Sequence, residues 1–229
     1  MGKDHLIRLA APKTWQIKRK EQKFITKQSA GAHSLETSMA LGVIMKEVLN
    51  YATTTREVKK IINTNEIRVD GKARKDFRFS IGLFDTIEFT SINEYFRVII
   101  NKKGKICLVK INKSESNTKP CKITGKTVVK GKIQLNLYDG KNIIVDKDSY
   151  KVGDTLMVSL PDHKVSKHFA LGKNATIFLT GGKHIGETGK VEDIISNKII
   201  YKDSNNELLE TSKQYAFVIG DEKQAIKLE

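Results

Sequence analysis

Residues Thr55–Phe89 read TREVKKIINTNEIRVDGKARKDFRFSIGLFDTIEF, and this stretch predicts a short helix, a basic hairpin and a hydrophobic strand. Thr54 precedes the helix as an N-cap, and Glu57 completes a capping box three residues later. The helix gathers its apolar residues on one face, and these are Val58, Ile61 and Ile62. A compact helix–hairpin unit therefore forms the centre of the predicted fold.

The hairpin follows the helix directly. Ile67 and Val69 alternate with polar residues at the period of a strand. Asp70-Gly71 predicts a tight turn, because a type I′ turn requires positive φ at both central residues. Basic residues crowd beyond the turn, namely Lys72, Arg74, Lys75 and Arg78. Two interpretations stay open, which are a face for a phosphate backbone and a solvated hairpin in an ordinary α+β domain.

The composition points to a polyanionic partner. The chain has 229 residues, with 41 Lys and Arg against 26 Asp and Glu and a formal charge of +15. This balance favours nucleic acid first and an acidic membrane surface second. No apolar run approaches the roughly 20 residues of a membrane-spanning helix, and we expect no signal peptide. Two cysteines, Cys107 and Cys121, indicate a reducing compartment and no thiolate metal site.

Residues 1–34 are predicted to form a basic N-terminal arm. Between Met1 and Lys27, eight Lys and Arg accompany two acidic residues, and Trp15 and Phe24 interrupt the charges. This composition buries too little apolar surface to fold alone, so we expect the arm to become ordered on a partner. Basic arms with aromatic residues suit RNA, which offers phosphates and unstacked bases. A solubilising tail or an expression leader is the alternative.

A longer helix is predicted between the arm and the opening stretch. Ser34 is its candidate N-cap, and the helix runs over Leu35–Tyr51. Apolar residues cover much of its circumference, which indicates packing in a core rather than exposure. Together with the second helix and the hairpin, it defines a unit over residues 35–92.

Residues 93–169 predict a central β domain. Short strand patterns alternate with turn signals such as Asn101–Gly104 and Asp139-Gly140, and Lys113–Pro120 resembles a loop. The segment carries 16 basic and 7 acidic residues, which is the largest local excess in the chain. Lysines spread over hairpins form either a solvated face with protected edge strands or a surface that contacts phosphates.

Residues 170–229 predict a small SH3-like barrel. They hold 8 basic and 9 acidic residues, and the stretch Ala175–Val191 reads ATIFLTGGKHIGETGKV. Its glycines allow tight turns and close backbone approach. A nucleotide-binding loop is excluded, because the Gly-Lys-Ser/Thr ending is missing.

No catalytic constellation is recognisable in the sequence. The five histidines are scattered without metal-ligand spacing, and neither a nucleophile elbow nor a cysteine with a neighbouring base occurs. We therefore expect no cofactor, no metal and no small-molecule substrate, although catalytic residues distant in sequence remain an open alternative.

The chain resembles the S4e family of archaeal and eukaryotic-type small-subunit ribosomal proteins. The resemblance rests on six segments in the same order: His5–Trp15 (HLIRLAAPKTW), Ser29–His33 (SAGAH), Val58–Ile61 (VKKI), Ile67–Asp76 (IRVDGKARKD), Thr180–Gly189 (TGGKHIGETG) and Phe217–Gly220 (FVIG). In that family they correspond to the N-terminal signature, the linker after it, the αL RNA-binding module, the KOW motif and the closing strand.

The resemblance implies a mostly β, α+β protein in four parts. These are a basic arm (1–34), an αL-type helix–helix–hairpin domain (35–92), a central β domain (93–169) and a KOW SH3-like barrel (170–229). It further implies a non-catalytic constituent of the small ribosomal subunit in the cytoplasm. The expected partners are small-subunit rRNA and neighbouring ribosomal proteins, with no membrane.

Candidate RNA-binding residues come from three of these parts. They are Lys3, Arg8, Lys13, Trp15, Lys18, Arg19 and Lys20 in the arm; Arg56, Lys59, Lys60, Arg68, Gly71, Lys72, Arg74, Lys75 and Arg78 in the αL unit; and Gly182, Lys183, Gly186 and Gly189 in the KOW loop. Two other classes of function are alternatives. One is an RNA-modifying enzyme with an αL substrate clamp, and the other is an elongation-factor-like RNA-binding module.

Overall fold

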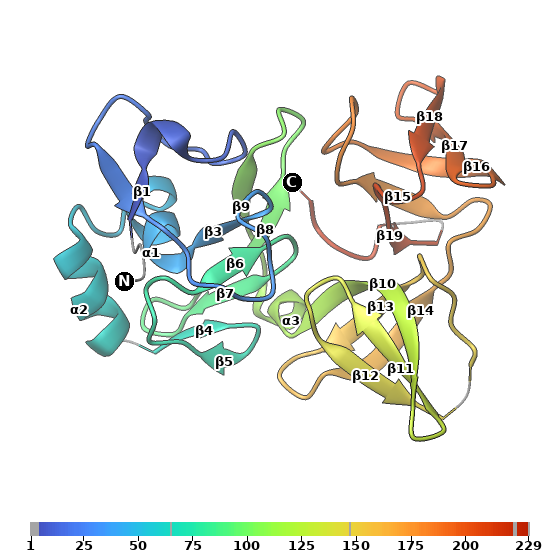
Figure 1. The fold of residues 1–229 in the computed structure, drawn as a ribbon, viewed down its shortest axis with the longest axis horizontal. Helices are drawn as coiled ribbons and strands as arrows, with labels where there is room; N and C mark the ends of the chain where they lie inside the picture. The colour runs from blue at the N-terminus through green and yellow to red at the C-terminus, as the bar shows by residue number, and fades with distance from the viewer. Residues whose placement is uncertain (1–4, 65, 147, 222–223, 229) are drawn as a thin grey trace. The chain divides into compact units, whose positions relative to one another are not determined.

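The computed structural model describes residues 5–64, 66–146, 148–221 and 224–228. The chain divides into two compact units, one with Met1–Ile100 and Lys105–Asn117, the other with Asn101–Gly104 and Thr118–Glu229. Strands dominate both units, and the helices are few and short (Figure 1). The mostly β class predicted from the sequence is confirmed.

The first unit is built on a five-stranded antiparallel sheet with the order β5-β4-β7-β8-β9. Its strands are β4 (Ile67–Val69), β5 (Lys72–Ala73), β7 (Thr86–Phe89), β8 (Glu94–Ile100) and β9 (Ile106–Lys110). All of β7 and the last five residues of β8 are buried, so the centre of this sheet belongs to the core. Strands β7 and β8 are hydrogen-bonded partners. The boundary between residues 92 and 93, which the sequence predicts between two parts of the chain, therefore lies between two strands that pair with each other, β7 and β8.

The two helices of this unit differ in how well they were predicted. Helix α2 (Thr55–Thr64) lies where the sequence predicts it. The longer helix predicted from Leu35 is wrong in its first part, because Ser38–Ala40 forms strand β3 and pairs with β6 (Ser80–Gly82). Helical structure begins only with α1 (Leu41–Val43) and continues as a π-helical turn, η2 (Ile44–Val48). A segment that is apolar on all sides fits a buried strand as well as a buried helix.

The N-terminal arm is part of the first unit. Its strands β1 (His5–Ile7) and β2 (Phe24–Thr26) pair with each other, and the 3-10 helix η1 (Arg8–Ala10) follows β1. The Trp15 side chain is 1% exposed. The expectation that this arm needs a partner to become ordered is wrong, because its one tryptophan already packs into the core of its own chain.

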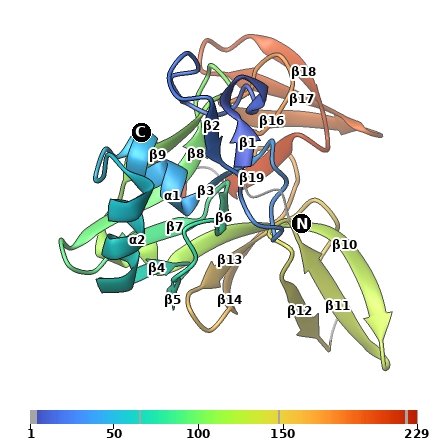
Figure 2. The ribbon, with the colours of Figure 1, turned by 60° about the vertical axis from the view of Figure 1, so that its left-hand side comes forward.

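The second unit contains two five-stranded antiparallel sheets. The central one has the order β12-β11-β10-β13-β14. Its strands are β10 (Thr118–Val129), β11 (Lys132–Leu137), β12 (Asn142–Val145), β13 (Thr155–Ser159) and β14 (Lys164–Phe169). Strands β10 and β11 form the long hairpin that is prominent in Figure 2. The core on this sheet consists of Cys121, Ile123, Leu135, Leu137, Leu156 and Val158.

The segment Lys113–Pro120 is not a loop as predicted. It consists of the short helix α3 (Lys113–Ser116) and the start of β10. The cause is pairing that the local sequence does not show, because Thr118, Lys119 and Pro120 face Ser159, Val158 and Met157 of β13. Tertiary contacts decide the structure of this polar segment.

The C-terminal sheet has the order β18-β17-β16-β15-β19. Its strands are β15 (Thr176–Leu179), β16 (Thr188–Ile195), β17 (Lys198–Asp203), β18 (Leu208–Ser212) and β19 (Ala216–Gly220). β15 is the first strand of this segment along the chain and pairs with the last one, β19, which brings the two ends of the segment together. All residues of β15 and β19 are buried.

A buried lysine connects the two sheets of the second unit. The Nζ of Lys122 in β10 donates to the carbonyl oxygens of Lys213, Gln214 and Ala216, at 3.3, 2.9 and 2.7 Å. Burial lowers the pKa of Lys122 to about 8, and the charge of Lys213 adds to this effect. The ammonium group is therefore held inside the fold by backbone dipoles rather than by a carboxylate.

The Lys122 amine predicts a specific pH dependence. Its ordinary pKa is 10.5, so between about pH 8 and pH 10.5 the unfolded state binds more protons than the folded state, and stability rises with pH. Replacing Lys122 with methionine removes this increment. We expect the melting temperature of the wild-type chain to rise relative to that of Lys122→Met when the pH goes from about 7.5 to about 10. A difference that stays constant over this range would contradict the assignment.

Candidate nucleic-acid interface

The cap of helix α2 holds the first group of candidate residues in place. Glu57 N–H donates to Thr54 Oγ1 at 3.2 Å, and Thr54 N–H donates to Glu57 Oε2 at 3.2 Å. Hydrogen bonds from Thr53 and then from Thr54 lower the pKa of Glu57. The predicted capping box is confirmed. Val58 and Ile62 point into the core, and the candidate residues on the other side, Arg56, Lys59 and Lys60, are exposed.

The hairpin turn has the predicted conformation. Asp70 has φ of 51° and Gly71 has φ of 72°, as a type I′ turn requires. Asp70 Oδ1 accepts the Thr86 N–H at 3.1 Å, which ties the turn to β7. Gly71 therefore has a geometric role, and Lys72 directly after it is exposed.

The three arginines around the hairpin are held by contacts within the protein or are partly buried, whereas the lysines there are exposed. Arg68 pairs with Glu66 at 2.7 Å, and this hydrogen bond raises the pKa of Arg68. The Arg74 guanidinium lies 4.3 Å from the centre of the Phe79 ring. Arg78 is half-buried. Lys75 is exposed, so it is better placed than these arginines to meet a phosphate.

The segment after the hairpin joins it to helix α2. Lys59 of α2 lies over the Phe77 ring, 4.6 Å from its centre, while Arg74 lies over Phe79. Phe77 also contacts the first helix, because its carbonyl oxygen accepts the Gly42 N–H at 2.7 Å. The cations of helix and hairpin thus sit on one connected framework, which limits their movement relative to each other.

Three candidate residues of the arm make structural contacts within the fold. Arg8 is buried and forms a bidentate ion pair with Glu47, in which Nη2 donates to Oε1 at 2.9 Å and Nη1 donates to Oε2 at 3.2 Å. Trp15 Nε1 donates to the carbonyl oxygen of Ser38 at 2.7 Å. Arg19 donates to the carbonyl oxygens of Ala11 and Pro12, at 2.8 and 2.6 Å. The terminal guanidinium nitrogens of Arg8 and Arg19 and the indole Nε1 of Trp15 thus bond within the first unit, so these three side chains have structural roles there.

The arm lysines remain on the surface. Lys13, Lys18 and Lys20 are exposed, and Lys18 forms only a solvated ion pair with Glu21 at 3.4 Å. Lys3 lies outside the described residues. The arm therefore offers lysines and no tryptophan to a ligand.

The glycine loop of the C-terminal sheet is mostly a structural turn. Gly182 has φ of 86° and is exposed with Lys183, while Gly189 is buried in β16. A Cβ atom at Gly186 would lie 2.4 Å from the carbonyl group of Asn101, so this glycine meets backbone of its own unit. His184 Nδ1 and Glu187 Oε2 are 3.0 Å apart across the loop. Of these candidates, Lys183 has the side chain best placed for contact.

Comparison with known proteins identifies the family. The model of the ribosomal family S4e matches residues 92–165, and that of the RS4NT (NUC023) domain matches residues 1–36. The small ribosomal subunit protein eS4 of Methanococcus aeolicus is 41% identical to this chain, over 98% of the chain and 97% of that protein. The chain belongs to the ribosomal S4e family.

Other S4e proteins agree in sequence and in fold. The small ribosomal subunit protein eS4 of Methanocaldococcus jannaschii is 41% identical over 99% of this chain and 98% of that protein. The crystal structure of the 30S ribosomal protein S4e from Thermoplasma acidophilum matches with a TM-score of 0.70 and 32% identity, over 81% of this chain and 96% of that one. The family is one of ribosomal structural proteins and not of enzymes.

Sequence reasoning missed Lys46 and Gln22 of this S4e-family chain, which line the same cavity as Lys59. Lys46 lies within the long helix predicted over Leu35–Tyr51 and was not among the candidate residues, but its Nζ donates to Gln22 Oε1 of the arm at 3.5 Å. Only the folding of the arm onto the helix brings them together, so no local signal could have found them.

In the described part of the chain, no helix has the length and apolar character needed to cross a membrane.

Proposed function

We propose that this S4e-family chain binds small-subunit rRNA, as a non-catalytic constituent of the small ribosomal subunit in the cytoplasm. Its other partners are the ribosomal proteins beside it. The helical segment α1–η2, helix α2 and the β4–β5 hairpin act together as an αL-type RNA-binding module. The sheet of β15–β19 acts as the KOW barrel.

One observation carries the proposal, which is a set of exposed cations on the capped helix and the hairpin. We name Arg56, Lys60, Lys72 and Lys75 the basic set; all four are exposed, and within the described residues none of them has an ion-pair partner. Arg56 and Lys60 lie four residues apart and so share a face of α2. Unpaired cations on a rigid framework suit phosphates, whose neutralisation releases counterions and drives binding.

The central sheet adds a second basic surface. Several of its lysines are neutralised by carboxylates, such as Lys132 by Asp146 and Lys141 by Asp139. Others remain exposed without such a pair in the described residues, namely Lys130, Lys164 and Lys167. We infer that these supply further phosphate contacts, while shape and backbone recognition dominate over base readout.

Co-sedimentation tests this function directly. Extracts are separated on density gradients after a wash in high salt, and the chain is followed by mass spectrometry. We expect it in the small-subunit fraction in amounts equal to those of other small-subunit proteins. Recovery in the supernatant or with the large subunit would contradict the proposal.

A further inference from the structure

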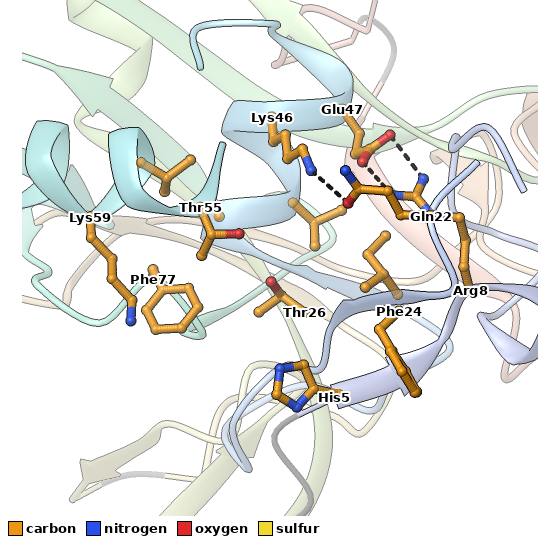
Figure 3. Close-up of a pocket in the computed structure, with 14 residues that line it drawn as sticks. His5, Arg8, Gln22, Phe24, Thr26, Lys46, Glu47, Thr55, Lys59 and Phe77 are labelled. Atoms are coloured by element: carbon orange, nitrogen blue, oxygen red, sulfur yellow. Dashed lines mark hydrogen bonds and ion pairs between the residues drawn. The ribbon is translucent and has the colours of Figure 1, made fainter. Parts of the chain in front are cut away.

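A cavity of about 380 Å³ lies in the first unit between the arm, the first helix and helix α2 (Figure 3). The apolar residues Ile25, Val43 and Val58 form part of its lining. Polar and aromatic side chains also line it, namely His5, Gln22, Phe24, Lys46, Lys59 and Phe77. The size is at the lower end of the range for small-molecule sites, which is roughly 300–1,000 Å³.

The charges around this cavity favour an anion. Arg8 and Glu47 both line it, but they neutralise each other through their two hydrogen bonds. Lys46 and Lys59 remain, and neither forms an ion pair within the described residues. A phosphate group at the opening would therefore meet two ammonium groups and no uncompensated carboxylate.

The cavity also presents aromatic surface to a ligand. The Phe24 side chain is 49% exposed, and His5 packs edge-on against it with ring centres 6.0 Å apart. Phe77 lies on the opposite side beneath Lys59 (Figure 3). Aromatic rings with cations beside them bind the flat faces of nucleobases in single-stranded RNA. Gln22 adds an amide that can both donate to and accept from a base edge.

We propose that this cavity receives one unstacked nucleotide of single-stranded RNA. The base enters between Phe24 and Phe77, and its phosphate lies against Lys46 and Lys59. This inference rests on the proposed function, and it adds a site for a base to an interface otherwise made of phosphate contacts. It also gives the folded arm a role, because the arm forms one wall of the cavity.

The experiment compares two oligomers that differ only in their bases. The full chain is titrated with a short single-stranded RNA and with a ribose-phosphate oligomer of the same length without bases, and amide shifts are followed by NMR. We expect the RNA to shift amides of His5, Gln22 and Phe24 and to bind about tenfold or more tightly than the oligomer without bases. Equal affinity of both oligomers, or no shift at these amides, would overturn the proposal.

Matched variants locate the effect. Phe24→Ala removes an exposed ring from the cavity, and Leu9→Ala removes an exposed side chain, 71% accessible, from the same arm outside it. We expect Phe24→Ala to abolish the advantage of the RNA over the oligomer without bases and Leu9→Ala to preserve it. An unchanged advantage in Phe24→Ala would contradict the assignment of the base to this cavity.

The two proposals can fail separately. If the wild-type chain binds small-subunit rRNA but treats both oligomers alike, the cavity proposal is wrong and the proposed function stands. If it distinguishes the oligomers through Phe24 but does not associate with small subunits, the cavity proposal stands and the proposed function is wrong.

Discussion

Replacing Trp15 with alanine is expected to lower the free energy of unfolding of the first unit by about 3–5 kcal/mol, the range for truncating a buried Trp or Phe. The side chain is 1% exposed, and its Nε1 donates to the Ser38 carbonyl oxygen at 2.7 Å. The substitution leaves a cavity and removes a partner from Ser38 in β3. Since β3 pairs with β6, the damage reaches the strands beside the hairpin.

Hydrogen exchange of backbone amides is the suitable measurement, because Trp15 is the only tryptophan and its loss removes the fluorescence signal. We expect faster exchange in β3, β6 and α1 and unchanged exchange in β15–β19. Lys13→Ala, at an exposed position of the same arm, serves as the control and should change stability by less than about 0.5 kcal/mol. A loss below about 1 kcal/mol for Trp15→Ala would show that the arm is not part of this core.

The region from Thr54 to Phe89 could be predicted because its signals are local. A capping box needs residues three apart, and a type I′ turn needs two adjacent residues that accept positive φ. Both are visible in the sequence, and the structure has both. The strand alternation of Ile67 and Val69 is equally local and is confirmed by β4.

The arm could not be predicted because its stabilising contacts are distant in sequence. Arg8 pairs with Glu47, which lies 39 residues further along the chain, and Trp15 donates to Ser38, which lies 23 residues further along. Composition alone shows a basic segment with one tryptophan, which describes a disordered arm equally well. The same distance explains why the sequence does not show the internal contacts of Arg8, Trp15 and Arg19, which are typical RNA-binding residues by type.

Neutralising the basic set is expected to weaken binding to small-subunit rRNA by about 10³-fold at roughly 0.1 M salt. Each phosphate contact contributes roughly 0.7–0.9 to the slope of log K against log salt concentration, so four contacts contribute about three. All four side chains are exposed, so their replacement by glutamine should leave the fold intact. Circular dichroism and thermal melting check that it does.

A matched variant controls for net charge. Four other lysines are each paired with a carboxylate, and they are Lys110 with Glu94, Lys173 with Asp193, Lys198 with Glu210 and Lys202 with Glu192. Replacing these four with glutamine changes the formal charge by the same amount. Because their charges are already balanced locally, we expect a much smaller loss of affinity than for the basic set.

The salt dependence of rRNA affinity tests the central claim, that the capped helix and its hairpin contact rRNA phosphates, most directly. Affinity is measured from about 0.05 to 0.3 M salt for the wild type, the basic-set variant and the matched variant. We predict that the slope of log K against log salt concentration falls by about three for the basic-set variant and by less than one for the matched variant. Equal slopes for the wild type and the basic-set variant would show that this face does not contact the RNA.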